Sequence, residues 1–165
     1  MRCARHRRQH LTAAKAAAEI CFGELVSADL GSRNLRFQPG EVRAGEFHFA
    51  VGTAGSPGLV FQTILPALLC ASGTSRLTLE GGMHNPSAPP FEFPRDAFAP
   101  RMADMGAGLT LEIERAGFYP AGGGLWTADI TPCVVLQPVE WTERGELVSH
   151  QAVATLARLA RGIGD

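Results

Sequence analysis

The chain lacks several features that would identify common classes of protein. Its four cysteines stand far apart and form no C-x-x-C pair, so the spacing gives neither a zinc site nor a redox motif. Fifteen basic residues against 16 acidic ones leave no general field that would attract a polyanion. The longest apolar stretch, Leu59 to Ala71, is interrupted by polar residues and a proline and is too short to cross a bilayer. We therefore expect reduced thiols, no membrane span and a cytoplasmic location.

What the sequence does contain is the periodicity of a layered α/β domain. Apolar residues recur at helical spacing in segments 11–22 and 96–105, and the apolar segment 57–69, which opens with proline, is expected to be a buried helix. Shorter alternating segments predict strands at 25–28, 34–38, 46–51, 76–80, 109–114 and 126–130. Pro66 is expected to kink or end the second helix early. This order favours helices on one face of a mixed sheet.

After Pro132 the pattern changes. Residues 139–148 are expected to form a strand, and residues 150–161 have the spacing of an amphipathic helix. These two segments are interpreted as the first pieces of another module.

Glycine gathers at three places where chemistry could occur: residues 52–58, 81–90 and 117–124. The segment Gly52 to Gly58 precedes a helix, and its backbone N–H groups could cradle a phosphate at the positive end of the helix dipole. It matches neither the Walker pattern nor G-x-G-x-x-G, and a tight strand-to-helix turn explains it equally well. The segment Gly117 to Gly124 permits close approach by a ligand or, as a purely structural interpretation, by a neighbouring strand.

Two polar residues stand out beside these segments. His84, in the glycine- and proline-rich loop from Gly81 to Pro90, could be a base, ligand or nucleophile, although a hydrogen-bonded loop residue is the commoner case. Gln62 lies on the otherwise apolar second helix. Its amide is expected on a buried face and so needs partners, which backbone groups or a ligand could supply. Spacing alone gives no metal-ligand cluster and no catalytic triad.

The start of the chain is densely basic, with Arg2, Arg5, Arg7 and Arg8 within eight residues. Such a cluster can neutralise phosphates, although a solvated terminus is the simpler interpretation.

Four motifs carry a resemblance to a known family: QHLTAAKAAAEIC from Gln9, GTAGSPGLVFQTILPALL from Gly52, GGMHNPSAPPFEF from Gly81 and GFYPAGGG from Gly117. In this order and spacing, the chain resembles RNA 3'-terminal phosphate cyclase. The resemblance implies a fold of repeated units, each with two helices packed on a four-stranded mixed sheet. It also implies that residues 1–135 form part of the main domain and that 136–165 begin a small insert domain.

The resemblance implies a reaction as well. ATP, with Mg²⁺ or Mn²⁺, adenylates a histidine, AMP moves to the 3'-phosphate of an RNA, and the vicinal 2'-hydroxyl closes a cyclic phosphate. By motif matching, Gln62 and Pro89 would line the ATP site. Candidates for contacts with the RNA phosphate are Arg5, Arg7, Arg8 and Gln9.

Some parts of the family pattern have no counterpart in this sequence. The family's glycine-rich first segment, with its metal-binding glutamate, has no match before Met1, and the adenylated histidine is expected outside this chain. We therefore expect an incomplete cyclase that is inactive alone. The alternatives are a non-catalytic relative that binds RNA or assists ribosome assembly, and a carbohydrate-type transferase, against which the third and fourth motifs argue.

Overall fold

A computed structural model describes residues 8–52, 54–86, 88–133, 135–156 and 162. A four-stranded mixed sheet forms its centre, with the order β3-β4-β6-β5. Strand β3 (Glu46–Ala50) runs parallel to β4 (Ser75–Gly81), while β6 (Gly124–Thr131) is antiparallel to both β4 and β5 (Gly108–Arg115). The predicted mixed sheet is therefore confirmed. A separate antiparallel pair, β1 (Glu24–Val26) and β2 (Arg36–Gln38), follows the first helix.

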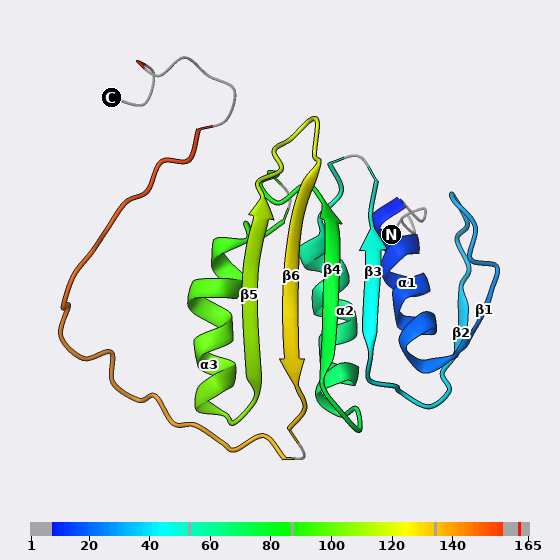
Figure 1. Cartoon of the computed structure of the whole chain (residues 1–165), viewed down its shortest axis with the longest axis horizontal. Coiled ribbons are helices and arrows are strands. Elements are labelled where there is room, and N and C mark those ends of the chain that lie inside the picture. The colour runs from blue at the N-terminus through cyan, green and yellow to red at the C-terminus, as the bar shows by residue number, and fades with distance from the viewer. Residues whose placement is uncertain (1–7, 53, 87, 134, 157–161, 163–165) are drawn as a thin grey trace.

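The helices cover one face of this sheet (Figure 1). Helix α1 (Arg8–Cys21) packs on α2 (Pro57–Leu69), whose bounds agree with the sequence prediction. Proline at the first turn of α2 is tolerated because its missing N–H would have no intrahelical partner there. Of the two expectations for Pro66, the early end is wrong, since the helix continues for three residues to Leu69, and the kink stays a prediction.

The third helical segment begins earlier than its periodicity predicted. A π-helical turn, η1 (Phe93–Phe98), leads directly into α3 (Ala99–Asp104). In the turn, the N–H of Ala99 donates to the carbonyl of Pro94, five residues back. Pro100 follows and has no N–H, so it cannot extend an α-helical ladder to the residue four positions before it. The wider turn accommodates this break.

The core lies between the helices and the sheet. Side chains that alternate along β4 and β6 face the helices and are at most 1% exposed: Leu77, Leu79, Trp126, Ala128 and Ile130. The opposite face of the sheet carries exposed pairs, including Arg76 with Asp129 at 2.8 Å and His48 with Glu80 at 2.6 Å. One apolar and one polar face explain the alternation read in the sequence.

The chain beyond β6 differs from the prediction. The described residues of 135–156 form neither the strand expected at 139–148 nor the start of the helix expected at 150–161 (Figure 1). A strand needs a pairing partner and a short amphipathic helix needs a surface to pack on. Neither is supplied here, and Val148 is 96% exposed. Residues 157–161 lie outside the described residues, and the division at 135 stays a prediction.

The longest of the described helices has 14 residues, and none has both the length and the apolar character needed to span a bilayer.

Candidate functional site

The three glycine-rich segments meet at one end of the sheet. Strands β3, β4 and β5 all end at the upper edge in Figure 1, and each leads into one of these segments. The N–H of Gly82 donates to the carbonyl of Gly55 at 2.8 Å, and the N–H of Met83 donates to the carbonyl of Gly117 at 2.9 Å. Motifs that lie far apart in the sequence therefore form one continuous surface.

Close packing of backbone against backbone explains why these segments are rich in glycine. A Cβ atom on Gly82 would overlap the carbonyl oxygen of Ala54, and a Cβ atom on Gly117 would overlap the backbone N of Gly124. The structural interpretation of the 117–124 segment, a tight inter-strand connection, is confirmed. The 52–58 segment is a strand-to-helix turn, and its proposed phosphate-binding role stays a prediction.

A pocket of about 110 Å³ lies between α2 and the segment that contains Pro89 and η1. Gln62 and Pro89, which the family resemblance assigned to one site, both line it. Its other lining residues are mainly apolar or aromatic: Gly58, Phe61, Leu65, Pro66, Phe93, Pro94 and Phe98. Phe93 and Phe98 were not predicted as site residues, although aromatic residues so soon after the proline-rich loop were a usable signal.

Gln62 lines this pocket from an exposed position on α2, whereas a buried position was expected. The prediction that its amide lies on a buried face of α2 is wrong, because the residue is exposed. The buried side of the helix is formed by neighbours such as Phe61, Ile64 and Leu65. An exposed amide needs no protein partner, so its position at the pocket leaves its hydrogen-bonding groups available to a ligand.

Gln9, a predicted phosphate contact in the first turn of α1, contacts the residue before α2. Its side-chain oxygen Oε1 accepts a long hydrogen bond, 3.5 Å, from the backbone N–H of Ser56, the N-cap residue of α2. Arg8 is exposed at the first residue of α1, whereas Arg5 and Arg7 lie outside the described residues. The contact of these four residues with an RNA phosphate stays a prediction, but two of them lie near the positive end of a helix dipole.

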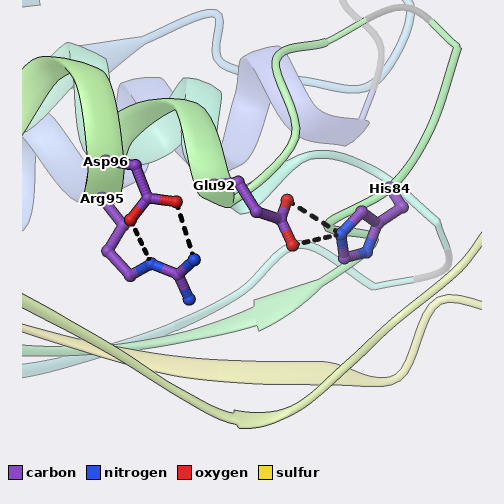
Figure 2. Close-up of polar contacts among 4 residues, drawn as sticks. All are labelled: His84, Glu92, Arg95 and Asp96. Atoms are coloured by element: carbon purple, nitrogen blue, oxygen red, sulfur yellow. Dashed lines mark hydrogen bonds and ion pairs between the residues drawn. The ribbon is translucent and has the colours of Figure 1, made fainter. Parts of the chain in front are cut away.

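His84 does not line this pocket and is paired with Glu92. Figure 2 shows both carboxylate oxygens of Glu92 directed at one ring nitrogen of His84, and the distances to Nε2 are 3.1 and 3.0 Å. The His84 ring stacks on Phe118, with centroids 4.6 Å apart and planes inclined by 16°. His84 is thus a hydrogen-bonded loop residue, and its alternative roles as base, ligand or nucleophile stay predictions. Glu92, eight residues later, was not predicted as its partner.

The environment of Glu92 favours its ionised form. Burial alone would raise the pKa of this carboxyl, but hydrogen bonds from its own backbone N–H and from His84, with the nearby charges of His84 and Arg95, bring the pKa below its ordinary value of 4.5. Arg95 is itself bound to Asp96 by two hydrogen bonds, at 2.6 and 2.7 Å (Figure 2). The ionised carboxylate of Glu92 therefore holds the imidazole of His84 in place.

Glu92 should make stability depend on pH in the acid range. A carboxyl with a lowered pKa in the folded state stabilises that state above its unfolded pKa and loses this effect as pH falls through the folded value. We expect the wild type to exceed Glu92→Gln in free energy of unfolding at neutral pH, with the difference shrinking below the ordinary value of 4.5. Urea unfolding at a series of pH values measures this difference.

Removal of the histidine provides the control for that prediction. In a His84→Gln background, the loss of stability caused by Glu92→Gln should be smaller at neutral pH but not zero, because Glu92 keeps its backbone hydrogen bond. A loss that is independent of pH, or that grows in acid, would contradict the assignment.

Among the described residues, no three His, Cys, Asp or Glu side chains gather closely enough to hold a metal ion. The described residues therefore form no complete divalent-cation site by themselves, and the expected Mg²⁺ or Mn²⁺ stays a prediction.

The comparisons with known proteins agree with the motifs. A sequence model of the family described as RNA 3'-terminal phosphate cyclase matches residues 6–163. The chain is 52% identical over 158 residues to a protein of Koribacter versatilis (strain Ellin345) named RNA 3'-terminal phosphate cyclase. The match covers 96% of this chain but only 44% of that relative, so the chain spans less than half of the relative's length.

Proposed function

Because the chain belongs to the RNA 3'-terminal phosphate cyclase family, we propose that it supplies the nucleotide pocket of an enzyme that uses ATP to close a 2',3'-cyclic phosphate at an RNA end. The observation that carries this proposal is the pocket shared by Gln62 and Pro89. The RNA carries a 3'-phosphate, and the reaction takes place in the cytoplasm.

The chemistry proceeds in three transfers. A histidine of the enzyme, outside this chain, attacks the α-phosphorus of ATP, and pyrophosphate leaves. An oxygen of the RNA 3'-phosphate then displaces the histidine and takes the AMP. Finally the 2'-hydroxyl loses its proton and attacks the terminal RNA phosphorus, AMP leaves with its oxygen, and the ring closes. Adenylation converts an oxygen of the phosphate from a poor into a good leaving group.

The residues of the pocket suit the base of ATP. Flat apolar walls, with the rings of Phe93 and Phe98 among them, can contact the faces of a purine. Gln62 offers both a donor and an acceptor, the combination that the edge of an adenine requires. Gly58, in the first turn of α2, also lines the pocket, so a base held there has its phosphates within reach of the helix N-terminus.

Gln62→Leu tests the role of the amide. Leucine keeps the size and helix propensity of the residue but removes its hydrogen-bonding groups, so we expect ATP affinity to fall about 2- to 10-fold, the range for one net hydrogen bond. Isothermal titration of the chain with ATP measures it. Thr63→Val is a matched control, because Thr63 is the next residue, is exposed and bonds only to the carbonyl of Leu59 among the contacts described. Equal ATP affinity in the Gln62→Leu variant and the wild type would contradict the assignment.

The activity itself is tested by transplanting the chain. In the Koribacter relative, the 158 aligned residues are replaced by those of this chain, and conversion of a 3'-phosphate RNA to its cyclic form is followed with and without ATP. We expect ATP-dependent cyclisation, reduced by Gln62→Leu and retained by Thr63→Val. A folded chimera that binds the RNA but never cyclises it would instead favour the non-catalytic, RNA-binding alternative.

A further inference from the structure

The loop end of the sheet carries an aromatic cluster that the nucleotide pocket does not use. It consists of the rings of His84 and Phe118, and Tyr119, the residue after Phe118, is counted with them as their exposed neighbour in the chain. The rings of His84 and Phe118 are stacked, and Tyr119 follows Phe118 in the loop between β5 and β6. Tyr119 is 64% exposed, although it is the single tyrosine of the chain and its ring has a large apolar surface. None of the three contributes to the buried core.

Hydrogen bonds fix the His84 ring and the backbone of the cluster in place. Glu92 holds the His84 ring through Nε2, as described above. The backbone N–H of His84 donates to the carbonyl of Gly117 at 3.0 Å, and the N–H of Tyr119 donates to the carbonyl of His84 at 3.1 Å. A surface that is already ordered loses little conformational entropy when a ligand binds.

The cluster also lies next to the segment proposed to meet the RNA phosphate. The side-chain amide of Asn85, the residue after His84, donates to the carbonyl of Ala54 at 3.3 Å. Ala54 is two residues before Ser56, whose N–H is bonded to Gln9. A 3'-terminal nucleotide whose phosphate lies near Gln9 would therefore have its base close to the aromatic cluster.

We propose that the aromatic cluster stacks on the base of the 3'-terminal nucleotide of the RNA, with Tyr119 as the exposed contact. This inference rests on the proposed function and specifies how the site binds the base at the end of its RNA substrate. Single-stranded RNA is commonly held by stacking its bases on aromatic and histidine rings. Every base has a π-face, so the cluster accepts any of the four bases at the RNA end.

Binding of a fluorescent single-stranded RNA with a 3'-phosphate to the full chain, followed by anisotropy, tests the proposal. Stacking on one aromatic ring contributes about 1–3 kcal/mol, so Tyr119→Ala should weaken binding about 5- to 150-fold. Tyr119→Phe, which keeps the ring, should bind like the wild type. Trp141→Ala is the control for loss of an exposed aromatic ring, because Trp141 is 56% exposed and packs on Arg101 in the segment after β6.

A second RNA separates stacking from an indirect effect of the substitution. With an RNA whose 3'-terminal nucleotide keeps its sugar and phosphate but lacks its base, the wild type should lose affinity by about the same factor, and Tyr119→Ala should cause no further loss. The proposal is overturned if Tyr119→Ala matches the wild type on both RNAs, or if the wild type binds neither. The nucleotide pocket is judged separately by the ATP titration, so the inference can fail while the proposed function stands.

Discussion

Replacing Trp126 by alanine is expected to lower the free energy of unfolding by about 3–5 kcal/mol. Trp126 is 1% exposed on β6 and meets two other rings edge-on, Phe61 of α2 at 5.3 Å and Phe91 at 5.2 Å between centroids. The substitution removes both aromatic contacts and leaves a cavity where sheet, helix and proline-rich loop join. Because whole domains are stable by only about 5–15 kcal/mol, this is a large fraction of the total.

Leu125→Ala is the matched control for this loss. Leu125 precedes Trp126 on the same strand, points to the opposite face of the sheet and is only partly buried. Its truncation should cost less than half as much in urea unfolding. If Trp126→Ala does not fold, Trp126→Phe should give an intermediate loss. Equal losses for Trp126→Ala and Leu125→Ala would contradict the position of the core.

Gly82→Ala is expected to destabilise the protein by about 1–3 kcal/mol and to weaken ATP binding as well. The added methyl group would overlap the carbonyl oxygen of Ala54, and it would lie 2.8 Å from the carbonyl carbon of the same residue. These are backbone atoms, so the 81–90 loop must move away from the turn before α2. Pro89, which belongs to that loop and lines the nucleotide pocket, moves with it.

Gly73→Ala provides the comparison for Gly82→Ala. A methyl group there would meet only the Cβ of Ala44, at 3.4 Å, so we expect a change within about 0.5 kcal/mol and unchanged ATP affinity. Urea unfolding and ATP titration of both variants measure the two effects. A Gly82→Ala protein as stable as the wild type would show that the two glycine-rich segments do not pack as closely as described.

Local periodicity was sufficient to predict most of the layered fold. Helix α2 was predicted at its observed bounds because an apolar run begins at Pro57, where proline is favourable, and ends at Leu69. Strands β4 and β6 were predicted because their side chains alternate between an apolar and a polar face. In each case the pattern is set by contacts that repeat along a single element.

Periodicity failed where the outcome depends on another part of the chain. The strand expected at 139–148 has the composition of a strand but no partner among the described residues. The π-helical turn before α3 depends on Pro100, whose missing N–H breaks the hydrogen-bond ladder of the helix. The spacing of apolar residues gives no sign of this break. The prediction that Gln62 is buried was wrong because a nearly all-apolar helix gives no clear sign of which side faces solvent.

The candidate site was predicted in part. The family resemblance named Gln62 and Pro89, and the structure brings them to one pocket, although the whole of β4 and most of the proline-rich loop separate them in the sequence. Spacing alone could not have joined them, because their proximity arises from the packing of α2 beside the segment that follows β4. The pairing of His84 with Glu92 is a property of how a loop folds back, and no periodic signal encodes it.

Titration of the isotopically labelled chain with ATP, followed by amide chemical shifts, tests most directly whether the pocket beside α2 receives the base. We predict that the largest shifts occur at Gly58, Gln62 and Phe93, with little change at Arg76 and Asp129 on the open face of the sheet. Shifts concentrated at Arg76 and Asp129, or no saturable change at the pocket, would contradict the account.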